Sequence, residues 1–412
     1  MPRRIVIIGT MDTKGPEMRF IAGLIGARGH QALLMDVGIG DSLSFDAGVS
    51  RDEVLQAAGT SPEEIRSWRR DRIMATMARG AALLLQGMYH LDQVDGVIGL
   101  GGNQGTAIAA LAMQALPIGF PRVLVSTVAS GNIRPYIGYQ DIAMIFSVSD
   151  LLGGTNALSR VILSKAAGAI LGMVETTEQL SVPQDRPVIA ITAFGNTNQA
   201  VTRALELLTS NGYETITFHA SGACGSAMEE LIGRGLFAGV LDLTTHELLG
   251  ELYQEDIYAP VRPGRLEEAV RRGIPLVVAP GGLDYFCFGG VPTIPPRFRG
   301  RAVHYHNPFN TNVRTTAVEL TEVARLMAEK LNQGQGPITV LVPLRGWSEN
   351  GRKGGPLHDP EADGAFVAAL KGHLTRRIKL QELDANINDP VFAETAVREL
   401  LSMLSSSKND GA

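Results

Sequence analysis

The sequence predicts an α/β protein made of two related, doubly wound parallel-sheet domains of the Rossmann-like kind. Three observations support this fold class. Short runs rich in Val, Ile and Leu alternate with helical patterns. A stretch of the first half matches the second half at a constant offset. The length of 412 residues also exceeds what one ordinary hydrophobic core supports, and indicates about two domains.

The apolar runs are short, and each is followed by a glycine-rich or polar turn. The first half contains "RIVIIGT", "QALLMDVG", "DGVIGLGG" and "RVLVSTVASG". The second half contains "VIAITAFG", "TITFHASG", "GVLDLTT", "LVVAPGG", "AVHYHNP" and "ITVLVPLRG". Continuous apolar runs of this length between helices indicate parallel strands that are buried on both faces. Residues 51–90 of the first half form an additional segment with helical periodicity.

The internal match indicates a duplicated βαβ unit. Residues 5–40 align without a gap with residues 188–223, so that Ile5 matches Val188 and Asp36 matches His219. Later motifs follow in the same order, including Thr155-Asn156 and Thr311-Asn312, each of which we expect directly before a helix. We therefore predict an N-terminal domain at 1–182 and a C-terminal domain at 187–412, joined by a polar, proline-containing linker at 181–187.

Composition excludes several classes of protein. The net charge of −5 is small and the Lys and Arg residues are scattered, so direct nucleic-acid binding is not expected. Cys224 and Cys287 lack CxxC spacing and are expected to be small buried thiols in a reducing compartment. No uninterrupted run of about 20 apolar residues occurs, so we expect a cytoplasmic protein with no membrane association.

Two turns of the first half have the chemistry of a phosphate site. Ligands of an open parallel sheet gather beyond the carboxyl ends of its strands. The turn "GLGGNQGT" offers unhindered backbone amides at a helix start, and "GTMDTKGPE" adds a lysine and oxygen ligands suited to Mg²⁺. The alternatives are tight turning for the glycines, and helix capping or surface charge for the others. With "STVASGN" as a third side, the expected nucleotide contacts are Thr10, Asp12, Thr13, Lys14, Gly101, Gly102, Asn103, Gly105, Thr106, Ser130, Gly131 and Asn132.

The strand ends of the second half carry imidazoles and carboxylates, which suit acid–base chemistry or metal binding. His304 and His306 alternate along a predicted strand and so point the same way. Other interpretations stay open: a strand histidine can be a core or surface residue, and His246 with Glu247 can be the first turn of a helix. Asp359 is expected to cap the helix that follows it. The catalytic candidates are His219, Asp242, Glu247, Asp284 and His306, and the sequence identifies no metal.

Several long motifs together resemble a known family. They are "GTMDTKGPE", "GLGGNQGTA", "SGNIRPYIGYQDIAMIFSVSDLLGGTNALSR", "FHASGACGSAMEELI", "GVLDLTTHEL", "PGGLDYFCFG", "HNP" and "NDPVFAE". This set is similar to the ATP-binding domain family typified by the N-terminal part of the tomato mosaic virus resistance protein, most of whose members are uncharacterised. The resemblance implies two α/β subdomains, ATP binding with Mg²⁺ and homodimers. It implies no reaction.

The sequence therefore predicts a cytoplasmic ATP-binding protein that is an enzyme. We expect ATP and Mg²⁺ at the loops of the first domain, and a small acidic or sugar-like metabolite in a cleft between the domains. His219 or Glu247 is expected to move a proton there. One alternative is a non-catalytic, ATP-dependent regulatory or interaction protein. Another is a metal-dependent hydrolase or lyase whose chemistry lies in the second domain.

Overall fold

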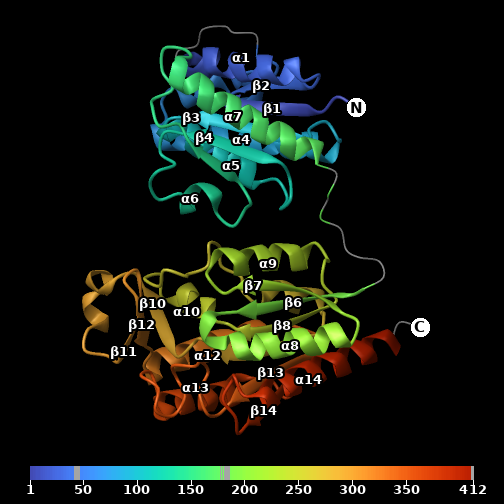
Figure 1. The fold of residues 1–412 in the computed structure, drawn as a ribbon, viewed down its shortest axis with the longest axis vertical. Coiled ribbons are helices and arrows are strands. Elements are labelled where there is room, and N and C mark those ends of the chain that lie inside the picture. The colour runs from blue at the N-terminus through green and yellow to red at the C-terminus, as the bar shows by residue number, and fades with distance from the viewer. Residues whose placement is uncertain (41–46, 177, 179, 181–185, 410–412) are drawn as a thin grey trace. The chain divides into compact units, whose positions relative to one another are not determined.

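The chain forms two compact units, Met1–Leu180 (unit 1) and Ser181–Ala412 (unit 2) (Figure 1). The computed structural model describes residues 1–40, 47–176, 178, 180 and 186–409. Most of the predicted linker at 181–187 therefore lies outside the described residues. Each unit contains a parallel sheet with helices, which confirms the predicted α/β class.

Unit 1 contains a five-stranded parallel sheet with the strand order β2-β1-β3-β4-β5. Helices α1 and α7 cover one face, while α2, α4 and α5 cover the other. The predicted additional segment at 51–90 forms helices α2, α3 and α4, as its periodicity indicated. The elements in chain order are β1 (Arg4–Gly9), α1 (Met11–Ala27), β2 (Gln31–Asp36), α2 (Arg51–Ala57), α3 (Pro62–Ile65), α4 (Arg70–His90), β3 (Gly96–Gly101), α5 (Asn103–Gln114), β4 (Arg122–Ser126), α6 (Arg134–Ile137), β5 (Ala143–Phe146) and α7 (Ala157–Glu175).

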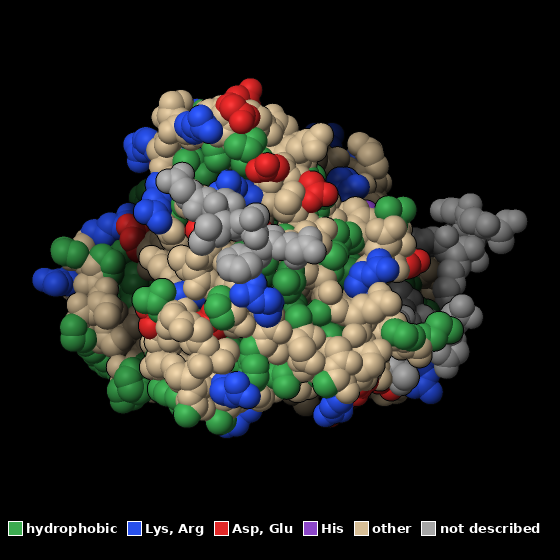
Figure 2. Space-filling model, turned by 90° about the horizontal axis from the view of Figure 1, so that it is seen from above, with side chains coloured by type: hydrophobic (Ala, Val, Ile, Leu, Met, Phe, Trp, Pro, Cys, Tyr) green, Lys and Arg blue, Asp and Glu red, His purple; other side chains and the backbone are tan. Residues whose placement is uncertain are grey.

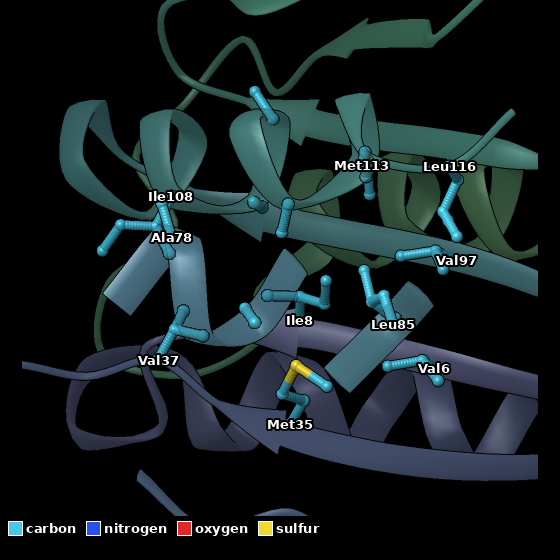
Figure 3. Packing of buried hydrophobic residues seen from close by; sticks show 14 of the residues in the cluster. Val6, Ile8, Met35, Val37, Ala78, Leu85, Val97, Ile108, Met113 and Leu116 are labelled. Carbon is cyan, nitrogen blue, oxygen red and sulfur yellow. The ribbon is translucent and has the colours of Figure 1, made fainter. Parts of the chain in front are cut away.

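The core of unit 1 follows from the alternation of side chains along its strands. Ile5 and Ile7 point toward α1 and α7, whereas Val6 and Ile8 point to the opposite face. Figure 3 shows Val6 and Ile8 packed among apolar residues of β2, β3, α4 and α5. Both faces of the sheet are thus buried, as continuous apolar strands predict.

Helix α7 is the one helix among the described residues that is long and apolar enough to cross a membrane. Its buried residues, which include Leu163, Ala167 and Ile170, belong to the core against β1, β3 and β4. We interpret it as a helix of the core of unit 1. On the face drawn in Figure 2, acidic and basic side chains lie interspersed among apolar and neutral ones.

Unit 2 contains a six-stranded parallel sheet with the order β7-β6-β8-β9-β13-β14, which begins with the same strand arrangement as unit 1. Strands β2 and β7 lie at the offset that the sequence match predicted. Helices α8 and α14 pack on one face. The elements are β6 (Val188–Ala193), α8 (Asn198–Ser210), β7 (Glu214–His219), α9 (Ala223–Gly233), β8 (Gly239–Thr244), α10 (Glu247–Leu252), α11 (Glu267–Arg272), β9 (Leu276–Gly281), β10 (Tyr285–Phe288), β11 (Val303–Asn307), β12 (Asn310–Arg314), α12 (Ala317–Asn332), β13 (Ile338–Pro343), α13 (Pro360–His373), β14 (Lys379–Leu383) and α14 (Pro390–Asn409), with short 3-10 turns at Gly195–Thr197, Val291–Thr293 and Pro296–Phe298.

A second, three-stranded antiparallel sheet of order β10-β12-β11 lies at one end of unit 2 (Figure 1). The prediction that "AVHYHNP" is a parallel strand was therefore wrong, because β11 forms a hairpin with β12 and its residues are partly or fully exposed. Thr311-Asn312 lies within β12 and not before a helix, which corrects that prediction too. Strands β5, β10 and β12 were not predicted.

Each parallel sheet has one point at which the strand order reverses. In unit 1 this point lies between β1 and β3, and in unit 2 between β6 and β8. The chain leaves such a pair of strands in opposite directions, so a crevice opens beyond their carboxyl ends. Ligand sites are expected at these two places.

Candidate functional site

Unit 1 has a pocket of about 530 Å³ at the reversal point between β1 and β3. This volume lies within the range of small-molecule and cofactor pockets. The pocket brings together the two turns that the sequence singled out, together with residues of α4 and of the segments after β2 and β5. Its lining residues are Thr10, Asp12, Thr13, Lys14, Ile39, Gly40, Arg70, Ile73, Gly102, Asn103, Gln104, Gly105 and Asp150.

Two helices begin at this pocket. Helix α1 starts after Thr10 and α5 starts after Gly102, and neither N-cap residue makes a side-chain capping bond within the described chain. Helix α7, by contrast, is capped by Asn156, which accepts from the backbone N–H groups of Leu158 and Ser159. The first N–H groups of a helix lack intrahelical partners, and the helix dipole favours an anion there.

Charged groups of both signs line the same pocket. Lys14 is only 7% exposed, and its Nζ lies 3.8 Å from Asp150 Oδ1. Arg70 donates to Gln104 Oε1 at 2.7 Å, which places its guanidinium beside the start of α5. Lys14 and Arg70 can neutralise phosphate oxygens, and the carboxylates of Asp12 and Asp150 can hold a hard cation.

The glycines of the second turn have different roles. A side chain at Gly101 would lie 2.7 Å from Gly105 Cα, so this position must stay small for β3 to pass α5 closely. At Gly102 the nearest atom to an added Cβ is Thr127 Oγ1 at 3.9 Å, so the fold itself tolerates a side chain there. Of these two glycines, Gly102 lines the pocket and can carry a side chain into it without disturbing the packing of the unit.

Five of the expected nucleotide contacts do not line this pocket. Gly101 ends β3, and the buried Thr106 hydroxyl contacts Gly101 O and Ser126 Oγ, which ties α5 to β4. Ser130, Gly131 and Asn132 follow β4 outside the lining. The sequence missed Ile39, Gly40, Arg70, Ile73, Gln104 and Asp150. Of these, Gln104 and Asp150 lay within recognised motifs but were not singled out, and the others reach the pocket through the tertiary fold.

Unit 2 has a smaller pocket of about 80 Å³ between its parallel sheet and its small antiparallel sheet. It brings together two catalytic candidates, His219 at the end of β7 and His306 on β11, whereas His304 is not among its lining residues. The His219 ring lies 5.0 Å from the ring of Phe194. Burial, and then the charge of His246, lower the pKa of His219, which favours the neutral imidazole that can accept a proton. The lining residues are Phe194, Gly195, Asn196, His219, Tyr258, Tyr285, Cys287, His306, Asn310 and Asn312.

Asp242 and Glu247 lie in a different environment. Both carboxylates contact the buried guanidinium of Arg265, at 2.8 Å and 2.5 Å, and Glu229 binds the same guanidinium. Glu247 also accepts from the backbone N–H groups of Gly222 and Gly225. All four charged groups are buried and none lines the small pocket. We conclude that this cluster holds α9, α10 and the segment before α11 together.

Asp284 is also separate from the two histidines. Its Oδ2 accepts from Ser348 Oγ at 2.6 Å, and its Oδ1 has no hydrogen-bond partner among the described residues. Burial raises the pKa of Asp284, against the opposing charge of Arg314. Asp359 caps α13 by accepting from Ala362 N at 3.0 Å, as expected.

Comparisons with known proteins find relatives whose similarity extends over nearly the whole chain. Residues 3–179 and 186–404 match the N-terminal and C-terminal domain models of the uncharacterised protein family UPF0261. A UPF0261 protein of Clostridium tetani is 40% identical over 98% of this chain and 100% of its own length. The ToMV resistance protein Tm-1(GCR237) of Solanum lycopersicum is 34% identical over 98% of this chain and 56% of its own length.

A comparison with solved structures gives weak likenesses. A Methanocaldococcus jannaschii UDP-GlcNAc 2-epimerase is 8% identical, with a TM-score of 0.21, over 97% of this chain and 93% of that chain. A likeness of this size carries no inference about function. The matches to both domain models and to full-length relatives show that this chain belongs to the UPF0261 family.

Proposed function

We propose that unit 1 binds ATP with Mg²⁺ in the pocket at the β1/β3 reversal point. The observation that carries this proposal is the pairing of two helix N-termini, those of α1 and α5, in one pocket with Lys14 and Arg70. The first-turn amides of α5, the dipoles of both helices and the two cations suit a polyphosphate, whereas Met11 N–H at the start of α1 already donates to Asp36 Oδ1 at 2.9 Å. Ile39 and Ile73 offer apolar contacts for a base.

Magnesium suits the oxygen groups of this pocket. Asp12 and Asp150 supply carboxylates, and Thr10 and Thr13, whose hydroxyls lie 2.8 Å apart, supply further oxygens. Mg²⁺ is commonly held by one or two carboxylates together with substrate phosphates. Bound Mg²⁺ would offset phosphate charge that Lys14 and Arg70 leave unbalanced.

The test is a calorimetric titration of the full chain with ATP, ADP and GTP, each with and without Mg²⁺. Lys14→Ala should weaken Mg·ATP binding at least tenfold, because it removes the least exposed cation of the pocket. Lys165→Ala is the matched control, since Lys165 is an exposed residue of α7 outside the pocket. Equal affinities for the native protein and Lys14→Ala would remove the support for a phosphate site.

We further propose that the chain is an enzyme whose small substrate binds in the small pocket of unit 2. Neutral His219 would be the proton acceptor, and His306 a second group in contact with the substrate. The alternative is a non-catalytic, ATP-dependent regulatory protein. Turnover of a substrate distinguishes the enzyme from this alternative. A metabolite screen that finds an activity lost in His219→Gln, with Mg·ATP binding intact, supports the enzyme. An activity that is unchanged in His219→Gln contradicts this assignment.

A further inference from the structure

Three donor groups of different chemistry meet behind the small pocket of unit 2. They are the imidazole of His246, the carboxylate of Asp256 and the thiol of Cys287. One ligand atom from each lies within 4.8 Å of the other two. The three residues are 0%, 3% and 2% exposed. They come from the start of α10, the loop that follows α10, and β10, so the tertiary fold assembles the cluster.

Each of the three groups is held in place by a further contact. His246 Nδ1–H donates to Gly282 O at 2.7 Å, which leaves Nε2 directed at the cluster. Tyr258 N–H donates to Asp256 Oδ1 at 2.7 Å and Cys287 N–H donates to Oδ2 at 2.7 Å, so the carboxylate is fixed with Oδ2 beside Cys287 and one lone pair of Oδ2 remains for a cation. Asn312 Nδ2 contacts Cys287 Sγ at 3.2 Å. Metal-binding histidines are commonly fixed in this way, with the second ring nitrogen on a carbonyl or carboxylate.

Charge balance allows a divalent cation in this place. Without an ion, Asp256 Oδ2 lies 3.1 Å from His246 Nε2, and this histidine is its ion-pair partner. A cation of charge +2 would replace the Nε2 proton of the imidazolium and the thiol proton of Cys287. Neutral imidazole, carboxylate and thiolate then surround the cation, and the buried cluster remains electrically neutral.

We propose that His246 Nε2, Asp256 Oδ2 and Cys287 Sγ bind a thiophilic divalent cation of the zinc class. A thiolate and an imidazole select such an ion over Mg²⁺, which prefers oxygen ligands. Three protein ligands leave one tetrahedral position for water or a substrate oxygen, as in catalytic zinc sites. Cys287 also lines the small pocket with His219 and His306, so we expect that position to open toward this pocket.

The proposal assigns a substrate class to the small pocket. A zinc-class ion polarises a carbonyl oxygen or lowers the pKa of a bound water. The ligand would be a small molecule with a carbonyl, carboxylate or hydroxyl oxygen, since the pocket holds only about 80 Å³. The inference is independent of the nucleotide site of unit 1, so either proposal can fail without the other.

The test uses Co²⁺ as the probe on full-length protein that has been treated with a chelator. We expect one Co²⁺ per chain and a thiolate-to-cobalt charge-transfer absorption band that Zn²⁺ abolishes by displacement. Cys287→Ser should lose this band. Cys224→Ser is the matched control and should keep it, because Cys224 lies outside the cluster.

A second measurement needs no variant and covers the case in which Cys287→Ser does not fold. Binding of one Co²⁺ to the native chain should release at least one proton, because the Cys287 thiol must lose its proton to bind the ion. Absence of the charge-transfer band, a band that persists in folded Cys287→Ser, or binding without proton release would overturn the proposal.

Discussion

At the scale of single residues, the buried guanidinium of Arg265 holds the carboxylates of Glu229, Asp242 and Glu247 together in unit 2. The sequence identified seven residues that line the pocket of unit 1, because the two turns that hold them follow a strand directly: Thr10, Asp12, Thr13, Lys14, Gly102, Asn103 and Gly105. Arg265 was missed, although it decides the environment of Asp242 and Glu247. Nothing in the sequence around Arg265 indicates that three distant carboxylates will surround it.

Arg265 gives a prediction about stability. Arg265→Met leaves the carboxylates of Asp242, Glu247 and Glu229 buried without their cation, so we expect a loss of about 3–5 kcal/mol in the free energy of unfolding. Arg271→Met is the control, because its ion pair with Glu268 is largely exposed and should contribute less than about 1 kcal/mol. Urea denaturation measures both, and equal losses would contradict a structural role for this cluster.

Asp363 gives a prediction about pH. Burial, against the opposing charge of Arg314, raises the pKa of Asp363 from 3.8 to about 6. Between these values the folded chain holds a proton that the unfolded chain has lost, so this group lowers stability as the pH rises from about 4 to about 6. Asp363→Asn cannot titrate, so its free energy of unfolding should fall less over this pH range than that of the native chain. The difference between the two declines should be about 3 kcal/mol at most. Urea denaturation at several pH values measures this, and parallel pH profiles would contradict it.

At the scale of elements, periodicity predicted the strands of the two parallel sheets well, because buried parallel strands have continuous apolar runs. β5, β10 and β12 were missed, since they are short and β12 is largely polar. The direction of β11 was predicted wrongly, because direction depends on its hairpin with β12 and not on its own composition. Pairing between strands is a tertiary property that a single run of residues does not encode.

Helix α4 offers a matched pair of glycines. A Cβ at Gly80 would lie 1.9 Å from Val54 O, so Gly80→Ala must push α2 away from α4 and should cost about 1–3 kcal/mol. Gly87, in the same helix, has no atom within 4 Å of the added Cβ. Gly87→Ala should therefore stabilise by about 0.5–1 kcal/mol through helix propensity. Thermal unfolding compares the two, and a neutral Gly80→Ala would contradict this close contact of α2 and α4.

At the scale of the whole molecule, the proposed nucleotide site lies in unit 1 and the proposed metal site lies in unit 2. Mg·ATP should stabilise unit 1, by about 2.7 kcal/mol at a hundredfold excess over its dissociation constant, and Zn²⁺ should stabilise unit 2. Scanning calorimetry should resolve two transitions. Gly80→Ala should lower the midpoint temperature of one transition alone, and this identifies that transition as the unfolding of unit 1. A single transition that both ligands shift equally would contradict this division.

The central claim is that the pocket between the N-termini of α1 and α5 is the ATP phosphate site. The most direct test is calorimetric titration of Mg·ATP into the native chain, Gly102→Val and Gly195→Val. Neither glycine has an atom within 3.5 Å of an added Cβ, and Gly195 lies in unit 2, in the turn after β6. We predict that Gly102→Val remains folded and loses Mg·ATP binding, while Gly195→Val binds as the native chain does. Undiminished binding by folded Gly102→Val, or no binding by the native chain, would contradict the claim.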